Sequence, residues 1–308
     1  MAKMDRRTFV KSALAGAAGV ALAGKGLAAP GGKPELVVLS GAGVRSGLDD
    51  AVAKLLEPLG GMKAFVRPGQ KVLIKPNMGF PTPPEQRATT SPALVAAVVK
   101  QVLECKPSLV LVADNPVRRP EACIRTNGIR EALQGLDVKL LLPTESSFFK
   151  KVDVPKGKSL RRVEIFREAL EADVHIALPV AKSHNAAGYS GALKGMMGMI
   201  LDRESFHGRY DLNQAIADLN TVIRPTLTIL DGLEVMTTDG PAGPGKLVRT
   251  DTLLAGIDPV AVDARGVELA PLYGRNIKAR QIKHLRFAQQ MGVGRLSVPQ
   301  DRVVQLKL

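Results

Sequence analysis

The chain has 308 residues, with 43 Lys and Arg against 29 Asp and Glu and a formal net charge of +14 at pH 7. Aromatic residues make up 4% and Trp is absent, so we expect no nucleic-acid partner, because single-strand platforms stack bases on aromatic side chains. The basic balance instead favours attraction of anionic ligands. Two cysteines, Cys105 and Cys123, are too few for an iron–sulphur cluster with four cysteine ligands; they form either a disulfide or two unpaired thiols.

Residues 1–29 have the pattern of a twin-arginine export signal. Arg6 and Arg7 precede a weakly apolar Ala/Gly stretch with a small-residue end at 27–29. The apolar part, residues 13–23, is too short to cross a bilayer as a helix. We therefore expect a periplasmic or otherwise exported protein that the twin-arginine translocase carries already folded. Residues 30–308 would form a single α/β domain.

Short apolar runs along the chain are typical of buried strands, and most are followed by helical spacing. They span residues 35–39, 71–74, 109–113, 138–142, 174–178 and 227–230. Alternation of such runs with helices favours parallel strands that are covered on both faces. The sequence therefore predicts an α/β fold with a mostly parallel sheet and helices on both faces.

Predicted helix caps and turns give the positions of the other secondary-structure elements. Ser91 and Asp258, each followed by proline, are predicted helix N-caps. A last helix is expected over about 278–291, ending at Gly292. Residues 151–163 predict a small edge hairpin. The Gly/Pro-rich stretch at 239–246 predicts a turn-rich loop, either a flap over a cleft or a rigid connector.

The sequence contains one approximate internal repeat that bears on the predicted site. Residues 106–116 and 224–232 both run from a basic residue and proline through an apolar strand to an aspartate, Asp114 or Asp231. Ligands of open parallel sheets bind outside the carboxyl ends of strands, so two pseudo-repeated halves would place both carboxylates at one cleft. Chance similarity between two ordinary buried strands explains this approximate repeat equally well.

A lysine and an asparagine, Lys75 and Asn77, follow the strand at 71–74. A proline-rich loop then brings polar side chains to a helix N-terminus, namely Arg87, Thr89, Thr90 and Ser91. Free N–H groups and the helix dipole make such a terminus a candidate anion site. The alternative is simple capping by Ser91, with Arg87 in solvent.

The segment "KSHNAAGYSGALKGMMGMI", residues 182–200, carries Lys182 and His184 beyond the strand at 174–178. With Ser190 as N-cap and about 100° per residue, one helix side collects Gly191, Lys194, Gly195 and Gly198, and the opposite side is apolar. A glycine inside a helix costs about 1 kcal/mol relative to alanine, so something is expected to approach closely. The candidates are a ligand, with Lys194 at its rim, or a second packed helix.

The histidines and carboxylates of the predicted site are compatible with more than one kind of chemistry. His184 and His207 are expected near the cleft, whereas His175 and His284 are expected to be structural. His184 could shuttle protons near neutral pH, or the imidazoles and aspartates could hold a divalent metal, although no HxxxH or HxH spacing is present.

Eight motifs stand in an order that resembles the domain of unknown function 362 family: "VLIKPNM", "ATTSP", "ADNP", "PVAKSH", "SGALKGMMGMI", "ILDG", "DGPAGPG" and "GIDPVAVD", over residues 60–265. The resemblance implies an α/β domain of unassigned biochemistry. Many members add ferredoxin-type cysteine motifs, which are absent here. The residues that match the shared motifs are Lys75, Asn77, Thr89, Thr90, Asp114, Lys182, His184, Lys194, Gly198, Asp231, Gly240, Asp258 and Asp263, with His207 a looser match. Where the family commonly has "LKN", this chain has "LKG".

The resulting hypothesis is a cleft that binds a small anionic ligand or cofactor bearing phosphate or carboxylate. Proton transfer or electrophilic stabilisation would fall to Lys182, His184 and Asp231; ligand binding to Lys75, Asn77, Thr89, Thr90, Lys194 and Gly198; and any divalent metal to Asp114 and His207. The alternative is a non-catalytic factor that holds a cofactor or metal for an exported redox partner.

Overall fold

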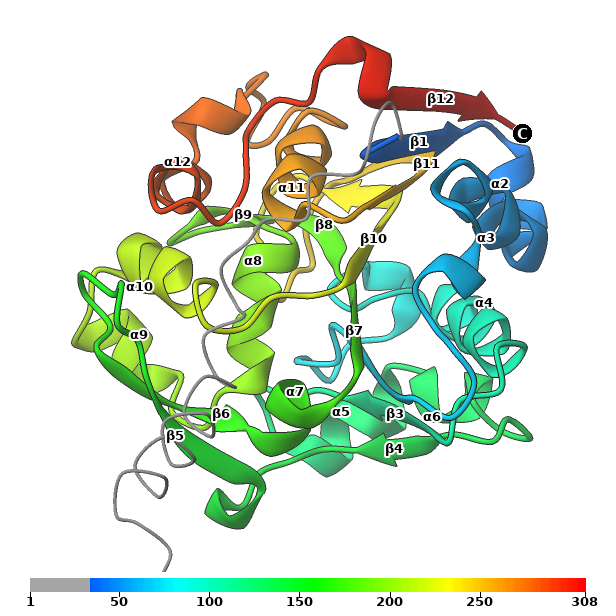
Figure 1. The fold of residues 1–308 in the computed structure, drawn as a ribbon. Coiled ribbons are helices and arrows are strands. Elements are labelled where there is room, and N and C mark those ends of the chain that lie inside the picture. Colours follow the sequence, from blue (N-terminus) through cyan, green and yellow to red (C-terminus); the bar gives the residue numbers. More distant parts are fainter. Residues whose placement is uncertain (1–33) are drawn as a thin grey trace, which may run out of the picture.

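The computed structural model describes residues 34–308 (Figure 1), and the predicted export signal lies outside the described residues. Within the described part, no helix is long and apolar enough to cross a membrane. Cys105 and Cys123 are both free thiols.

A ten-stranded sheet forms the centre of the molecule (Figure 1). Its main path runs in the order β12-β1-β11-β10-β7-β2-β3-β4, and β8 pairs with β10 and β9. The strands are β1 (Leu36–Ser40), β2 (Lys71–Pro76), β3 (Leu109–Ala113), β4 (Lys139–Leu141), β7 (Val174–Leu178), β8 (Val180–His184), β9 (Gly188–Ser190), β10 (Leu227–Met236), β11 (Leu247–Gly256) and β12 (Val303–Lys307). Pairing is parallel except at β1–β11, β10–β11 and β8–β9. The predicted α/β fold with a mostly parallel sheet is confirmed.

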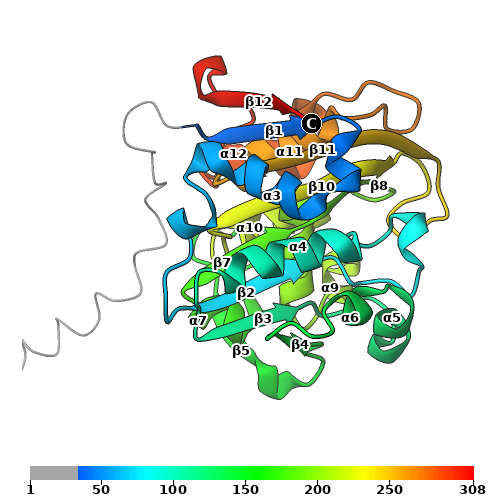
Figure 2. The same cartoon turned by 90° about the vertical axis from the view of Figure 1, so that its right-hand side faces the viewer.

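Helices cover both faces of this sheet, as the two cartoon views show (Figures 1 and 2). One face carries α2 (Gly43–Ser46), α3 (Leu48–Leu56), α4 (Pro92–Leu103), α5 (Pro120–Thr126) and α6 (Ile129–Ala132); the other carries α8 (Ala192–Gly195), α9 (Glu204–Gly208), α10 (Leu212–Leu219), α11 (Pro259–Val267) and α12 (Lys283–Gln290). A short α7 (Arg167–Glu171) precedes β7.

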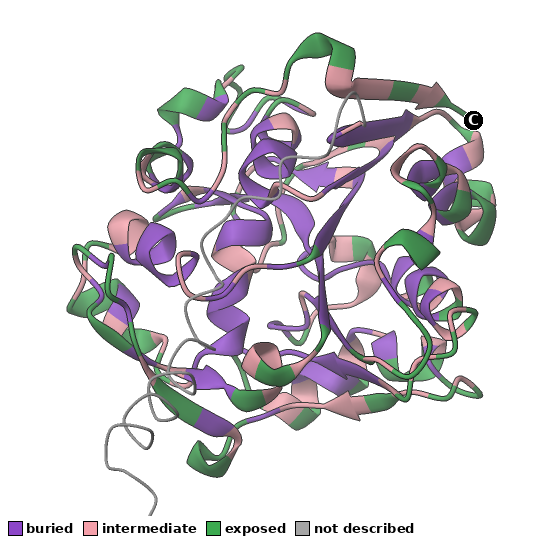
Figure 3. Ribbon diagram, in the orientation of Figure 1, coloured by how far each residue is buried: buried purple, intermediate pink, exposed green. Residues whose placement is uncertain are grey.

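Alternation along the strands divides the core in two. Val37 and Leu39 pack with α3 and α4, whereas Leu36 and Val38 belong to the core cluster on the opposite face. The central strands are accordingly buried on both sides (Figure 3). This is the burial expected of strands in a three-layer α/β arrangement.

Smaller elements complete the chain. The predicted edge hairpin is confirmed as β5 (Phe149–Asp153) paired antiparallel with β6 (Arg162–Phe166) in a separate two-stranded sheet. Short 3₁₀ helices lie at Glu57–Leu59, Met62–Ala64, Pro84–Gln86, Ser146–Phe148, Met196–Met199, Ala279–Gln281 and Gln300–Arg302.

Two predicted helix boundaries are wrong, and a third is right without the predicted side-chain cap. The last helix begins at Lys283 instead of about 278, because Ile282 before it has an extended backbone. Ser91 and Asp258 both stand at the predicted helix N-caps, but only the side chain of Asp258 makes capping hydrogen bonds. The helix expected from Ser190 is reduced to α8 and a 3₁₀ turn, since Ser190 still belongs to β9 and Gly191 stands at the cap in an extended conformation.

The two strands of the predicted pseudo-repeat have different surroundings. β3 lies between the parallel strands β2 and β4, whereas β10 lies between parallel β7 and antiparallel β11. β3 ends just before Asp114, but β10 continues five residues past Asp231 to Met236. Asp231 is therefore inside a strand and not at its carboxyl end.

Candidate functional site

A cavity of about 510 Å³ lies at the carboxyl ends of β2, β3 and β8. Its titratable lining consists of five basic side chains, two carboxylates and two imidazoles: Lys75, Lys182, Lys194, Arg118, Arg203, Asp114, Asp239, His184 and His207. Loops and short turns supply the other walls, as expected for a ligand site outside the ends of parallel strands. The lining has a clear excess of positive charge.

A buried ion pair lies on the floor of this cavity. The Nζ atom of Lys75 is 2.8 Å from Oδ1 of Asp114, and it also donates to the carbonyl oxygen of Pro76 at 2.8 Å. The second oxygen of Asp114 accepts from the backbone N–H of Met78 at 2.7 Å. Both side chains are almost fully buried, so each depends on these partners to offset its lost hydration.

Lys182 is fully buried and contacts no carboxylate in the described part of the chain. Its ammonium donates to the carbonyl oxygen of Ala88 and lies 4.7 Å from the centroid of the Phe80 ring. Burial, with the nearby charge of Lys194, lowers the pKa of Lys182 well below its usual value. A lysine in this setting deprotonates far more readily than one at the surface.

The loop that presents Ala88 is fixed at several points. Thr90 accepts from the backbone N–H of Asn77 at 2.9 Å and donates to the Leu178 carbonyl at 2.7 Å. The backbone N–H of Ser91 donates to Oδ2 of Asp231 at 2.8 Å. Thr90 and Asp231 therefore position the loop instead of lining the cavity.

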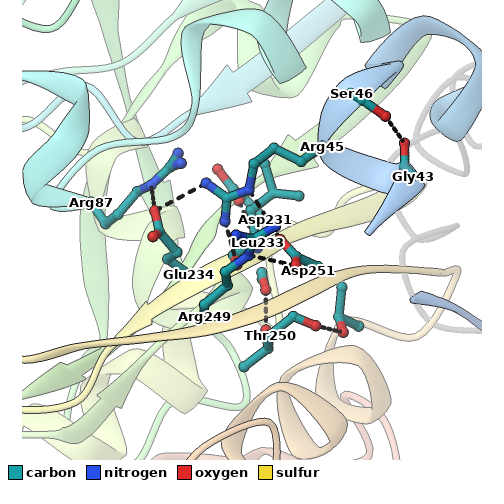
Figure 4. A network of polar contacts seen from close by, with 12 residues as sticks. Gly43, Arg45, Ser46, Arg87, Asp231, Leu233, Glu234, Arg249, Thr250 and Asp251 are labelled. Carbon is teal, nitrogen blue, oxygen red and sulfur yellow. Dashed lines mark hydrogen bonds and ion pairs between the residues drawn. The ribbon is translucent and has the colours of Figure 1, made fainter. Parts of the chain in front are cut away.

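An alternating chain of charges fixes the same loop from outside (Figure 4). Arg87 donates to Glu234 at 2.7 Å, and Arg45 contacts both Glu234 at 3.4 Å and Asp251 at 3.0 Å. Arg249 reaches Asp251 at 2.6 Å. The guanidiniums of Arg87 and Arg45 lower the pKa of Glu234 despite the opposing effect of burial. This network joins α2, the loop before α4, β10 and β11.

Lys194 projects into the cavity from α8. Buried Asp263 accepts from the N–H groups of Ala192 at 2.6 Å and Leu193 at 2.9 Å, which fixes the turn that carries this lysine. Burial, and then the charges of Arg203 and Lys75, lower the pKa of Lys194 to about 8. Its amine has no hydrogen-bond or ion-pair partner among residues 34–308.

His184 is oriented by backbone groups. Its Nδ1 accepts from the N–H groups of Ala186 and Ala187, each at 3.2 Å, so the neutral ring carries its proton on Nε2. Burial and the neighbouring Lys194 and Lys182 lower its pKa to about 3. The His207 ring stacks on it, with centroids 6.3 Å apart and planes 6° apart. This tautomer makes His184 a hydrogen-bond donor, and its Nε2 has no lone pair free for a metal or an incoming proton.

The Gly/Pro loop forms one wall of the cavity through residues 239–242. Gly240 donates to Oγ of Ser183 at 3.1 Å, and its carbonyl accepts from Asn185 at 3.1 Å. The loop is thus hydrogen-bonded to Ser183 of β8 and to Asn185, and it borders the cavity.

The structure gathers most of the predicted site residues. The cavity is lined by Lys75, Asn77, Asp114, Lys182, His184, Lys194, Gly198 and His207. Thr89, Thr90 and Asp231 are buried away from it. Asp114 and His207, the predicted metal ligands, both line the cavity, but residues 34–308 contain no group of three or more His, Cys, Asp or Glu side chains suited to a metal.

Two arginines of the site were missed by the sequence analysis. Arg203 donates to the backbone carbonyls of Asn115 and Pro116, and thereby ties the segment after the 190s to the loop after β3. Arg118 is exposed at the cavity wall. In the sequence, each of these arginines follows a predicted site residue within a few positions. Single basic residues are not distinctive in a basic chain, so this position alone does not mark them as site residues.

The chain is thus an α/β domain with a cationic cavity at the carboxyl ends of its strands. Residues 72–268 match the domain of unknown function DUF362, so the chain belongs to that family. The matched region contains nearly the whole lining of the cavity.

Two known proteins show how far the likeness extends. A thylakoid-associated protein from Synechocystis sp. is 31% identical over 219 residues, which cover 68% of this chain and 65% of that protein. The chain thus matches less than two thirds of this relative. The solved lactate racemase apoprotein from Thermoanaerobacterium thermosaccharolyticum is 15% identical with a TM-score of 0.40, over 84% of this chain and 58% of that one.

Proposed function

We propose that the cavity binds a small anion that bears a phosphate or a carboxylate. The observation that carries this proposal is the excess of five basic over two acidic side chains around one cavity. Among residues 34–308, only Asp114 forms an ion pair with any of the three lysines. Buried cations without counter-charges are costly, and an anionic ligand would offset that cost.

The neutral histidine suits the same role. Because Nδ1 of His184 is occupied by two backbone N–H groups, its Nε2–H is a donor that can bind an anionic or carbonyl oxygen without carrying charge. Phosphate and carboxylate oxygens accept several such bonds at once. Lysine amines and one imidazole N–H would then surround the ligand.

Proton transfer on the bound ligand is the finer proposal, and its best candidate is Lys182. Burial lowers the pKa of this amine well below that of an ordinary lysine, so it is more readily available in the uncharged form that accepts a proton. The alternative, a non-catalytic factor that holds a cofactor for an exported partner, needs the cationic contacts but no proton acceptor. Lys182→Met, which removes the amine without adding a buried charge, should abolish only catalysis and leave binding by the other cationic side chains in both cases.

Isothermal titration calorimetry with inorganic phosphate and with succinate tests the binding proposal. Lys194→Gln should weaken the affinity about 10-fold or more, because a charge-assisted hydrogen bond contributes about 1.5–3 kcal/mol. The matched control, Lys151→Gln, changes an exposed lysine outside the cavity and should have no effect. Equal affinities for the wild type and Lys194→Gln, or no binding of either anion, would refute the proposal.

Export is a separate proposal, supported by the residue pattern at 1–29. Changing Arg6 and Arg7 together to lysine should retain the full-length chain in the cytoplasmic fraction. Unchanged export of this variant would contradict recognition by the twin-arginine translocase.

A further inference from the structure

The three lysines of the cavity differ in what their amines contact. Lys75 is bound to Asp114 and to a backbone carbonyl. Lys182 donates to the carbonyl of Ala88 and lies over an aromatic ring. Lys194 alone among them faces the cavity without any protein partner in the part of the chain that the structure describes. Its nitrogen is the one placed to react with a ligand.

The surroundings of Lys194 favour the uncharged amine. The side chain is partly buried, and the two charges that lower its pKa, those of Arg203 and Lys75, are both positive. With a pKa of about 8, roughly a tenth of the amine is unprotonated at pH 7, against about one part in several thousand for an ordinary lysine. Desolvation beside another cation is a known way of making lysine a nucleophile.

The open space beside Lys194 and the fixed backbone that carries it favour attack of its amine on a ligand. A Cβ added to Gly195, the next residue, would meet no atom within 4 Å, so the backbone beside Lys194 is open to the cavity. The two N–H bonds to Asp263 hold the α8 turn in place. The amine is therefore carried by a fixed element at the edge of open space, which reduces the entropic cost of attack.

We propose that Lys194 forms a covalent imine with the carbonyl carbon of an anionic aldehyde or ketone bound in the cavity. The inference rests on the proposed anion site and deepens it: the ligand class becomes carbonyl compounds that also carry a carboxylate or phosphate. The anionic group would be held by the remaining cations, and the Nε2–H of His184 would donate to the carbonyl oxygen.

The chemistry balances without any further reactant. The Nζ lone pair attacks the carbonyl carbon, a C–N bond forms, and the π electrons move to oxygen, which takes up the proton released from nitrogen. The carbinolamine hydroxyl then takes a proton from solvent and leaves as water. The product is a protonated imine, so amine, carbonyl compound and one proton give iminium and water.

Reductive trapping tests the inference. The wild-type protein is incubated separately with glyoxylate and with glyceraldehyde 3-phosphate, reduced with sodium borohydride, and examined by intact mass and peptide mapping. We expect one reduced adduct per chain on Lys194 with at least one of the two probes. Trapping should increase with pH around a midpoint near 8. An adduct spread over surface lysines, or a midpoint near that of an ordinary lysine, would overturn the inference.

Lys194→Arg is the matched variant, because arginine keeps the positive charge but forms no such imine. It should remain folded, as measured by urea unfolding, while losing the adduct. Lys151→Arg, at an exposed position outside the cavity, should keep both the adduct on Lys194 and the anion affinity. Glycolate and glycerol 3-phosphate, which lack the carbonyl, separate the two proposals. If they bind the wild type but neither carbonyl probe is trapped, imine formation is refuted and anion binding stands. If they do not bind, the proposed function itself fails.

Discussion

The backbone of Gly198 lies directly against the carboxylate of Asp114. A Cβ built on this glycine would come within 1.8 Å of Oδ1 of Asp114 and 2.8 Å of Nζ of Lys75. The carbonyl of Gly198 also accepts from the backbone N–H of Asn115 at 2.8 Å, so the two segments cannot separate easily. Glycine at this position is what lets the ion pair lie on the cavity floor.

Two alanine substitutions three residues apart should therefore act in opposite directions. Gly198→Ala should destabilise the fold by about 3 kcal/mol or more, because the methyl group must displace a buried ion pair. Gly195→Ala, in a helical conformation with open space around it, should stabilise the fold by about 0.5–1 kcal/mol. Urea unfolding of both variants measures the difference. Similar unfolding midpoints would contradict the close approach at Gly198.

The glycine pattern shows what the sequence could predict here. Helical spacing indicated that something approaches these glycines, which the structure shows for Gly191 and Gly198 but not for Gly195. The structure identifies the approaching groups as Asp263 at Gly191 and the Lys75–Asp114 pair at Gly198, and leaves only Gly195 open to a ligand. Helical spacing shows which residues share one face of a helix. The groups that contact this face come from 70 or more residues away in the sequence, so no local pattern encodes them.

The strand ends show the same limit. Apolar runs located the strands of the central sheet, and polar residues just after them located Lys75, Asp114 and Lys182 in one cavity. Asp231 was misplaced because the strand does not stop there: β10 continues to pair with β11 beyond a bulge between Gly232 and Glu234, where the register shifts. Whether a strand ends at a charged residue depends on its partner strand, which the local sequence does not show.

Asp231 is expected to act on stability and not on ligand binding. Its two oxygens accept separately from the N–H groups of Ser91 and Leu233, at 2.8 and 3.2 Å. Asp231→Ala would leave both donors unpaired and should cost about 2–4 kcal/mol, since each unsatisfied buried group costs about 1–3 kcal/mol. Asp231→Asn, which keeps one acceptor, should cost less. Phosphate affinity at a temperature where both variants are folded should match the wild type; its loss in a variant of unchanged stability would assign Asp231 to the site.

The lowered pKa of Lys194 makes a prediction about alkaline stability. Between its native pKa of about 8 and the ordinary lysine pKa of about 10.5, the unfolded chain binds more protons at this residue than the native state does. The contribution of Lys194 to stability therefore increases as the pH rises through this window and is least favourable below pH 8. Lys194→Met should be more stable than the wild type at pH 7, and this advantage should shrink by pH 9.5.

Urea unfolding of the wild type and Lys194→Met at both pH values measures that change directly. Lys151→Met, at an exposed position, provides the control and should follow the wild type at both pH values. A constant difference between Lys194→Met and the wild type would show that Lys194 titrates normally in the folded state.

Acid should destabilise the protein through its buried histidines, and His284 isolates the effect. It is fully buried on α12, and neither ring nitrogen has a hydrogen-bond partner within the described residues. Burial, with the charge of Lys194, lowers its pKa to about 3. Below the ordinary histidine pKa of about 6.5 the unfolded chain takes up a proton that the native state does not, so stability falls as the pH decreases toward 3. Each such group contributes about 1.4 kcal/mol per pH unit well inside this window.

His284→Leu should remove this part of the acid sensitivity. At pH 7.5 the variant should be about as stable as the wild type, because an unpaired neutral imidazole is replaced by an apolar side chain in an apolar core. At pH 5 the variant should be more stable by about 1–2 kcal/mol, because only the wild-type unfolded chain gains a proton at residue 284. Unfolding free energies at the two pH values give the comparison. Parallel pH dependences would mean that His284 is protonated in the native state, and that its ring nitrogens reach water or an acceptor.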